Sequence, residues 1–304
     1  MDVVDQGAHD RFLAHVGGSP LNVAGGLAKL GQPTAFLARF STDPFGRILR
    51  AYAAATGADL SLAVDSPSPT TMAVVQLDAD GGARYDFYVG GTADWGWTAA
   101  ELEFLPASVQ LVHFGSLTSW LPPGADVVRQ RVASLHAAGR VLISYDPNVR
   151  PGLLTDPLRA REMIEASVAQ AHLVKASIED LDYLYPGVDP DTIARRWLDL
   201  GPILIVITRG ADGSCAFSRA GMVFRPAFVV TVVDTVGAGD AFMSGLLDGL
   251  MRAGTTSPAQ LRDFVADPVK VGRVLEDAAV IAGVVCSRAG AASPTREQLD
   301  AVRR

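Results

Sequence analysis

From residue 111 onward, short apolar runs alternate with longer stretches in which apolar positions recur at helical spacing. The runs are apolar at consecutive positions rather than at every second position, which is typical of parallel strands that are covered on both faces. They predict strands at residues 110–114, 141–145, 172–175, 203–208 and 228–233.

Helices are predicted between these strands, at residues 125–138, 157–171 and 190–200. A strand, a helix and a second parallel strand form a right-handed unit, and repeated units place helices on both faces of one sheet. The pattern therefore predicts an α/β fold with a doubly covered parallel sheet. Residues after 240 have mostly helical patterns and no linker divides the chain, so we expect one domain over residues 1–304.

Residues 70–91 depart from this pattern. Two strand-like segments, 71–77 and 83–88, flank the turn signal Asp78-Ala79-Asp80-Gly81-Gly82. They predict an antiparallel hairpin inserted into the α/β pattern. We interpret it as a lid that excludes water from a site, and a plain extension of a sheet edge is the alternative.

Polar residues and glycines follow the predicted strands. In open α/β sheets, the carboxyl ends of the strands are the edge where ligands bind. A series of five such turns favours a binding site over ordinary loop polarity. The turns are Gly115-Ser116, Asp146-Pro147-Asn148, Lys175-Ala176-Ser177, Thr208-Arg209-Gly210 and Asp234-Thr235.

Composition narrows the class of protein. The 304 residues are 49% hydrophobic and 19% charged, with a formal net charge of -7. There are only three lysines and the arginines are scattered, which argues against a nucleic-acid partner. No apolar run is long enough to span a membrane, and the polar residues 1–11 do not form a signal peptide. With two distant cysteines in apolar stretches and no histidine pair at metal-ligand spacing, we expect a cytoplasmic protein with buried thiols.

Candidate chemistry lies in residues 229–247. A β-branched stretch leads into the small-residue turn Gly237-Ala238-Gly239 and then into an apolar helical pattern. Backbone N–H groups at the start of a helix bind anions, and Asp240, in the first turn, could accept a proton beside a bound phosphate. A simple helix cap is the alternative. The glycine patterns of P-loop and dinucleotide-binding proteins are absent.

Two segments resemble signatures of one family. Residues 234–242, Asp-Thr-Val-Gly-Ala-Gly-Asp-Ala-Phe, resemble the C-terminal signature of the ribokinase-like, or PfkB, carbohydrate kinases. Residues 17–24, Gly-Gly-Ser-Pro-Leu-Asn-Val-Ala, with Leu30-Gly31, resemble the N-terminal signature. The resemblance implies a three-layer αβα sandwich with a small β-sheet lid, built here from about residues 1–16 and 68–93.

The resemblance also implies roles for individual residues. Asp240 is expected to act as the general base, with the backbone of Gly237, Ala238 and Gly239 as the anion hole for the transferring phosphate. Gly17 and Gly18 form a hinge, while Asn22 contacts the sugar. Residues 146–151, Asp-Pro-Asn-Val-Arg-Pro, are similar to a stretch of fructokinase-like and ketodeoxygluconate-kinase-like members, where the arginine, here Arg150, lies near the phosphate or the substrate. The residues expected near ATP are Lys175, Thr208, Gly210 and Gly213.

Two cations follow from the same resemblance. The segment around Ala289 to Ser293, with Asp234, resembles a potassium site that orders the anion hole. The Mg²⁺-linked motif of the family, Asn-x-x-Glu, reads Ser177-Ile178-Glu179-Asp180 here. Either Glu179 or Asp180 could organise the metal, and the register favours Asp180. Mg²⁺ would neutralise charge on the phosphates.

The start of the chain departs from the family pattern. Members open with a strand that ends in a sugar-binding aspartate, and here only Asp2 aligns with the end of that element. The strand before it could be missing because the start codon is assigned too far downstream, because the chain is truncated, or because the protein lacks it. We expect the first, in which case expression from an upstream in-frame start raises solubility and activity.

The resemblance predicts an ATP-dependent sugar kinase, most similar to fructokinases. A 2-keto-3-deoxygluconate kinase, a ribokinase or a nucleoside kinase of the same fold is the nearest alternative. A non-catalytic sugar-binding or regulatory protein on a kinase scaffold is the alternative from another class. Because the lid strands would leave an open edge, a lid-to-lid homodimer is also expected.

Overall fold

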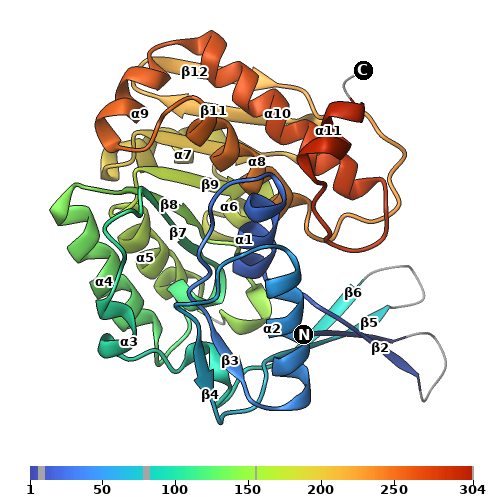
Figure 1. Cartoon of the computed structure of the whole chain (residues 1–304). Helices are drawn as coiled ribbons and strands as arrows, with labels where there is room; N and C mark the ends of the chain where they lie inside the picture. The colour runs from blue at the N-terminus through green and yellow to red at the C-terminus, as the bar shows by residue number, and fades with distance from the viewer. Residues whose placement is uncertain (6–10, 78–82, 155, 303–304) are drawn as a thin grey trace.

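A six-stranded sheet forms the centre of the protein (Figure 1). The computed structural model describes residues 1–5, 11–77, 83–154 and 156–302. The strand order is β12-β11-β10-β9-β8-β7. These strands are β7 (Leu111–Gly115), β8 (Leu142–Asp146), β9 (Leu173–Ser177), β10 (Leu204–Thr208), β11 (Ser214–Ser218) and β12 (Gly221–Arg225).

The parallel part of this sheet confirms four of the five predicted strands. Strands β7, β8, β9 and β10 pair in parallel, and β11 and β12 extend the sheet as an antiparallel hairpin. The carboxyl ends of β7 to β10 therefore meet at one edge of the sheet, which confirms the expectation for four of the five polar turns.

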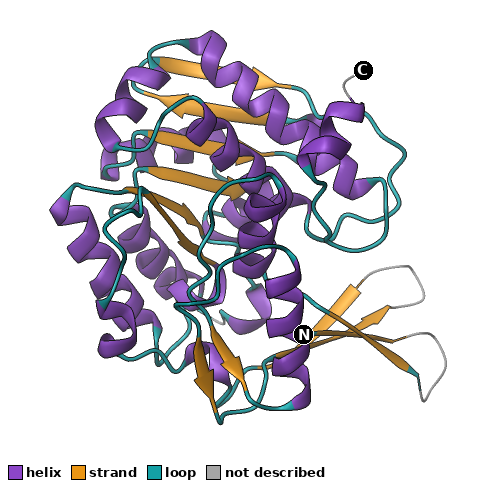
Figure 2. Cartoon of the chain, viewed as in Figure 1, coloured by secondary structure: helices purple, strands orange, loops and turns teal. Residues whose placement is uncertain are grey.

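Helices cover both faces of the sheet, which confirms the sandwich (Figure 2). One face is covered by α4 (Ala125–Ala138), α5 (Pro157–Val168), α6 (Ile178–Leu184) and α7 (Pro190–Leu200). The other is covered by α1 (Ser19–Lys29), α8 (Ala238–Arg252), α9 (Pro258–Val265) and α10 (Pro268–Cys286). Successive residues of a strand face opposite helix layers: Ile143 packs against the first set of helices and Leu142 against the second.

A second sheet, of four strands, extends from the main body (Figures 1 and 2). Its order is β2-β1-β5-β6, from β1 (Asp2–Asp5), β2 (Phe12–His15), β5 (Met72–Leu77) and β6 (Ala83–Tyr88). The antiparallel β5–β6 pairing confirms the predicted hairpin, whose turn at residues 78–82 lies outside the described residues. Strand β1 pairs with β2 antiparallel and with β5 in parallel, so distant segments build one sheet.

The remaining elements connect the two sheets or close the chain. They are β3 (Arg39–Ser41), β4 (Val64–Ser66), α2 (Pro44–Ala55), α3 (Ala99–Glu103) and α11 (Arg296–Val302), with short 3₁₀ turns at Ala93–Trp95, Ser116–Ser119, Pro151–Leu153 and Gly210–Asp212. Within the described residues, none of the helices combines the length and apolarity that crossing a membrane requires.

The strand predicted at residues 228–233 is wrong. This segment belongs to no strand or sheet, and Val229 is 92% exposed. The backbone N–H groups of Val233 and Asp234 both donate to the carbonyl of Cys286, at 2.8 and 3.2 Å. The run of β-branched residues favours an extended chain, but the sheet already ends at β12 and offers no neighbouring strand here.

Candidate active site

The N-terminus of α8 lies at the carboxyl edge of the central sheet and is open to solvent on one side. Its N-cap residue, Gly237, has no side chain that could cap the first turn. Helical N–H groups at this end lack partners within the helix, and the helix dipole adds positive potential. Ala238 N–H is partly engaged, since it donates to the Thr235 carbonyl at 3.2 Å. The remaining donors of this turn can hold an anion.

Gly237 is required by two features of this turn. Its φ is 78°, in the left-handed region, and a Cβ built on it would lie 2.4 Å from Cβ of Ala291. The segment around Ala291 thus crosses directly over the turn. Backbone geometry and close packing together explain why glycine stands here.

Asp240 points away from the helix backbone rather than capping it. Asn22 Nδ2 of α1 donates to Asp240 Oδ2 at 2.8 Å, and the Ser19 side chain also bonds to the carboxylate. The simple-cap alternative is therefore not what the structure contains. Burial raises the pKa of Asp240, the Ser19 and Asn22 hydrogen bonds lower it, Asp146 raises it and Lys175 lowers it.

Asp2 lies beside the N-terminal glycine pair. A Cβ on Gly17 would fall 1.8 Å from Asp2 Oδ2, so the carboxylate occupies the space that a side chain would fill. Gly18, the N-cap of α1, has a φ of 125°. Burial raises the pKa of Asp2, and the positive charge of Arg150 acts in the opposite direction. The structure thus brings the predicted sugar residues Asp2, Asn22 and Asp240 to the junction of the two sheets.

The loop after β8 carries Arg150 to the same junction. Asp146 Oδ1 accepts from the Asn148 N–H at 3.2 Å, and Asn148 adopts a positive φ of 40°. Arg150 Nη1 donates to Asn148 Oδ1 at 2.6 Å and to the carbonyl of Val149 at 3.0 Å. One side of the guanidinium is thereby fixed to its own loop, and the residue remains half-buried.

Lys175 lies beneath the first turn of α8. Its ammonium donates to Asp146 Oδ2 at 3.0 Å, and a Cβ on Gly239 would meet Nζ at 3.1 Å. The sequence pattern predicts this residue near ATP. The structure adds a buried carboxylate partner that no motif indicated.

The other residues predicted near ATP lie around the β10–β11 turn. Thr208 ends β10 and Gly210 follows it with a φ of 54°. Gly213 has a φ of 96°, and a Cβ there would lie 2.2 Å from the carbonyl oxygen of Arg225. Gly213 is therefore needed for the close passage of two chain segments, and its contact with ATP stays a prediction.

The two carboxylates of the Ser177–Asp180 motif differ in availability. Asp180 is buried and caps α6: Oδ2 accepts from Ser177 N–H at 2.8 Å, and Oδ1 accepts from Val149 N–H at 2.7 Å. Glu179 is exposed. Which of the two organises Mg²⁺ stays a prediction: the oxygens of Asp180 already accept backbone N–H groups, whereas Glu179 is exposed.

Asp234 connects the two segments that the predicted potassium site requires. Its Oδ1 accepts from Val236 N–H at 3.0 Å, and its Oδ2 accepts from Gly290 N–H at 2.9 Å. This clamp holds the segment of Ala289 to Ser293 against the anion-hole turn. Ser293 is buried, with Oγ 2.9 Å from a Cβ built on Gly26. Whether this segment holds K⁺ stays a prediction.

Asp94 is a site candidate that the sequence patterns did not indicate. It lies in the 3₁₀ turn after β6, bonded to Thr71 at the start of β5, and burial raises its pKa. Its neighbours Trp95 and Trp97 are buried. The sequence feature that could have indicated Asp94 is an acidic residue between the apolar residues Ala93 and Trp95.

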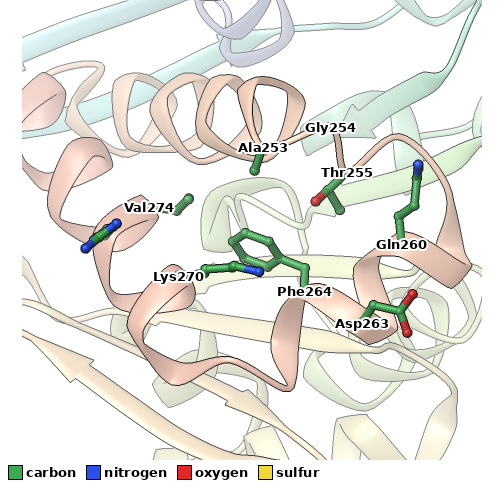
Figure 3. A pocket seen from close by; sticks show the side chains of 9 residues that line it. Ala253, Gly254, Thr255, Gln260, Asp263, Phe264, Lys270 and Val274 are labelled. Atoms are coloured by element: carbon green, nitrogen blue, oxygen red, sulfur yellow. The ribbon is translucent and has the colours of Figure 1, made fainter.

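A hollow of about 540 Å³ lies at the opposite end of α8 (Figure 3). It is lined by Ala253, Gly254, Thr255, Gln260, Asp263, Phe264, Lys270, Arg273 and Val274. None of the predicted site residues is among them. An α-helix of this length places the hollow roughly 20 Å from Asp240, so it is separate from the site described above.

The comparisons with known proteins agree with this geometry. The family model for the pfkB family carbohydrate kinases matches residues 4–298. A fructokinase of Rhizobium leguminosarum bv. trifolii is 39% identical over 239 residues, which is 79% of this chain and 72% of the relative. A fructokinase of Klebsiella pneumoniae is 35% identical, over 80% of each chain.

Solved structures share the whole fold. A fructokinase from Xylella fastidiosa with bound ATP superposes with a TM-score of 0.90 at 28% identity, covering 99% of this chain and 94% of its own. An aminoimidazole riboside kinase from Salmonella enterica superposes with a TM-score of 0.81 at 26% identity, covering 99% and 95%. The match over nearly the full length, with the signature residues assembled at the sheet edge, shows that the chain belongs to the pfkB family of carbohydrate kinases.

Proposed function

We propose that the protein phosphorylates fructose with ATP and that Asp240 is the general base. The observation that carries the proposal is the Asp240 carboxylate, which Asn22 fixes in the first turn of α8, where no side chain caps the helix. The fructokinase relatives support a ketose acceptor among the family's sugars.

The site has two ends, one that would bind the sugar and one that would bind the phosphates of ATP. At the sugar end, Asp2 and Asn22 would orient the acceptor hydroxyls, because carboxylate and amide oxygens accept their hydrogen bonds. Asp240 then removes the proton of the attacking hydroxyl as the oxygen–phosphorus bond forms and the bond to the ADP oxygen breaks. The N–H groups at the start of α8 stabilise the negative charge on the transferring phosphoryl group.

Glu179 would help to hold Mg²⁺ through its water shell, and Asp234 with the segment of Ala289 to Ser293 would hold K⁺. When bound, Mg²⁺ supplies positive charge to the phosphates. The hydrogen bond from Gly290 N–H to Asp234 would keep the neighbouring residue Ala291 packed against the turn at Gly237.

We also propose that the four-stranded sheet is a lid over the sugar end. Its base is fixed at two points: Asp43 accepts from the N–H and the hydroxyl of Thr70, and Arg39 donates to the Ala93 carbonyl. Gly90 and Gly91, just after β6, and Gly18, after β2, have open space around them and would serve as the hinges of this lid.

Edge strand β2 supports the proposal of a lid-to-lid homodimer. Phe12 and Leu13 of this strand are each 49% exposed, and pairing with a second copy would cover them. Sedimentation velocity of the purified protein tests the association.

The protein would act in the cytoplasm, where ATP is available.

Gly17→Ala is expected to raise KM for the sugar by about tenfold or more, because a Cβ at this position displaces the Asp2 carboxylate. KM for ATP stays the same, since the phosphate end is untouched. Steady-state kinetics with each substrate varied in turn checks this. In Asp2→Ala the added Gly17→Ala change should have little further effect, and additive losses would contradict the link through Asp2.

Replacing K⁺ in the assay buffer with tetramethylammonium is expected to lower kcat, because the anion-hole turn loses its ordering cation. Asp234→Asn should abolish the response to K⁺. Asp267→Asn is the matched control, because Asp267 also accepts two backbone N–H groups, at the start of α10, yet lies away from the turn. An equal K⁺ response in Asp234→Asn and wild type would contradict the assignment.

The decisive test of the function is ADP release across a panel of acceptors: fructose, 2-keto-3-deoxygluconate, ribose and a riboside. Fructose is expected to give the highest kcat/KM. A higher kcat/KM with another acceptor would assign the protein a different substrate within the same family. The absence of ATP turnover with every acceptor would favour a non-catalytic sugar-binding role.

A further inference from the structure

Asp146 and Lys175 form the most deeply buried ion pair among the described residues. Their side chains are 1% and 5% exposed, and Nζ lies 3.0 Å from Oδ2. They stand on the neighbouring parallel strands β8 and β9, on the face that α1 and α8 cover. Removing two charges from water costs more than their attraction commonly returns, so stability alone does not explain the pair.

The ammonium of Lys175 is directed at the catalytic turn. Gly239 lacks the Cβ that would lie 3.1 Å from Nζ, so this end of the lysine packs against the backbone one residue before Asp240. A positive charge is thereby fixed beside both the candidate base and the N–H groups of the anion hole.

Other charged groups face Lys175 from three elements. Burial lowers the pKa of Lys175, but the carboxylates of Asp146, Asp180 and Asp240 together raise it above its usual value, so the lysine stays protonated. His113 of β7 lies half-buried nearby, and its pKa is lowered to about 3, mainly by desolvation, so it stays neutral. Around Asp240 itself, Asp146 raises the pKa and Lys175 lowers it.

We propose that the Asp146–Lys175 pair is a positioning device that sets the base strength of Asp240. Lys175 keeps the Asp240 carboxylate ionised. Asp146 holds the ammonium on the sheet, so that Lys175 does not close onto Asp240 and weaken it as a proton acceptor. The inference rests on the proposed role of Asp240 as general base.

Two single substitutions should shift the acid limb of the pH profile of kcat/KM in opposite directions. In Lys175→Met, Asp240 loses a nearby positive charge and its pKa rises, so the acid limb of the kcat/KM profile moves to higher pH by about one to three units. In Asp146→Asn, Lys175 is released towards Asp240, so the acid limb moves to lower pH and the plateau rate falls. A purely structural pair would lower stability in both variants and leave the limb in place.

Arg296→Met is the matched control. Arg296 donates to the buried carboxylate of Asp248, which lies on α8 eight residues beyond Asp240. Losing this pair is expected to lower the melting temperature without moving the acid limb. Acid limbs of Lys175→Met and Asp146→Asn that coincide with wild type, or that shift the same way, would overturn the proposal.

A second measurement does not depend on turnover. The ¹³C carboxyl resonance of Asp240, assigned with Asp240→Asn, is titrated in the free wild-type protein, in Asp146→Asn and in the double variant Lys175→Met/Asp146→Asn. The double variant removes both charges of the pair, so neither partner is left alone, and it serves if Lys175→Met does not fold. The titration midpoint should be lower in Asp146→Asn than in wild type, and higher in the double variant than in Asp146→Asn. Equal midpoints overturn the inference, whereas an inactive wild type with these midpoints overturns only the proposed function.

Discussion

Asp240→Asn is expected to lower kcat by about a thousandfold while ATP binding is retained, because general base catalysis contributes factors of 10² to 10⁴. The amide has nearly the same shape and can still accept from Asn22 through its oxygen, so the α1–α8 contact persists. What is lost is the capacity to take the proton of the sugar hydroxyl. ADP release gives kcat, and calorimetric titration gives the Kd for ATP.

Asp248→Asn is the control on the same helix. Asp248 is a buried carboxylate that accepts from Gln32 and Arg296, and it lies two turns away from the reacting groups. Its substitution should reduce the melting temperature and change kcat little. Near-normal turnover in Asp240→Asn would contradict the assignment of the base, and loss of ATP binding would indicate a collapsed site.

Gly237→Ala should reduce kcat by about 10² to 10³, the range reported for removing one donor from a preorganised anion hole. Alanine is strained at a φ of 78°, and its Cβ would collide with Ala291. The turn and the segment around Ala291 must move apart, so the N–H groups no longer point at the phosphate. Because the sugar residues are untouched, KM for the sugar should change little.

Gly254→Ala separates strain from function. Gly254 follows the other end of α8 with a φ of 73°, and a Cβ there meets nothing within 4 Å. Both variants carry a backbone cost of roughly 1–2 kcal/mol for the left-handed conformation. Only Gly237→Ala should lose activity, and equal kcat in the two variants would show that the turn does not bind the phosphoryl group.

Much of the central sandwich could be predicted from the sequence, because buried parallel strands and their helices follow simple periodicities. Helices 125–138 and 190–200 match the structure at both ends. The run at 228–233 shows the limit: a β-branched segment is extended in isolation, but only the tertiary arrangement decides whether a neighbouring strand exists. Strands β11 and β12 were not predicted because polar residues or a glycine stand at their ends and leave apolar runs of only three residues.

The site was predictable where it depends on local backbone and not where it depends on side chains from distant elements. The Gly237–Asp240 turn carries its own signature. By contrast, the engagement of Asp180 by Val149, and the contact of Lys175 with Asp146, join residues that lie 31 and 29 positions apart. The pairing of β8 with β9 and the position of α6 after β9 fix these contacts, and one sequence does not show either arrangement.

The hydrogen bond between Asn22 and Asp240 spans 218 positions of the chain. During synthesis, strands β7 to β10 can form long before Asp240 has emerged from the ribosome, and the clamp to Gly290 comes later still. Contacts of such large sequence separation form slowly, since the entropy of closing the loop must be overcome first. The catalytic centre is therefore expected to assemble last, so that a nascent chain would be folded over much of its sheet before it could consume any ATP.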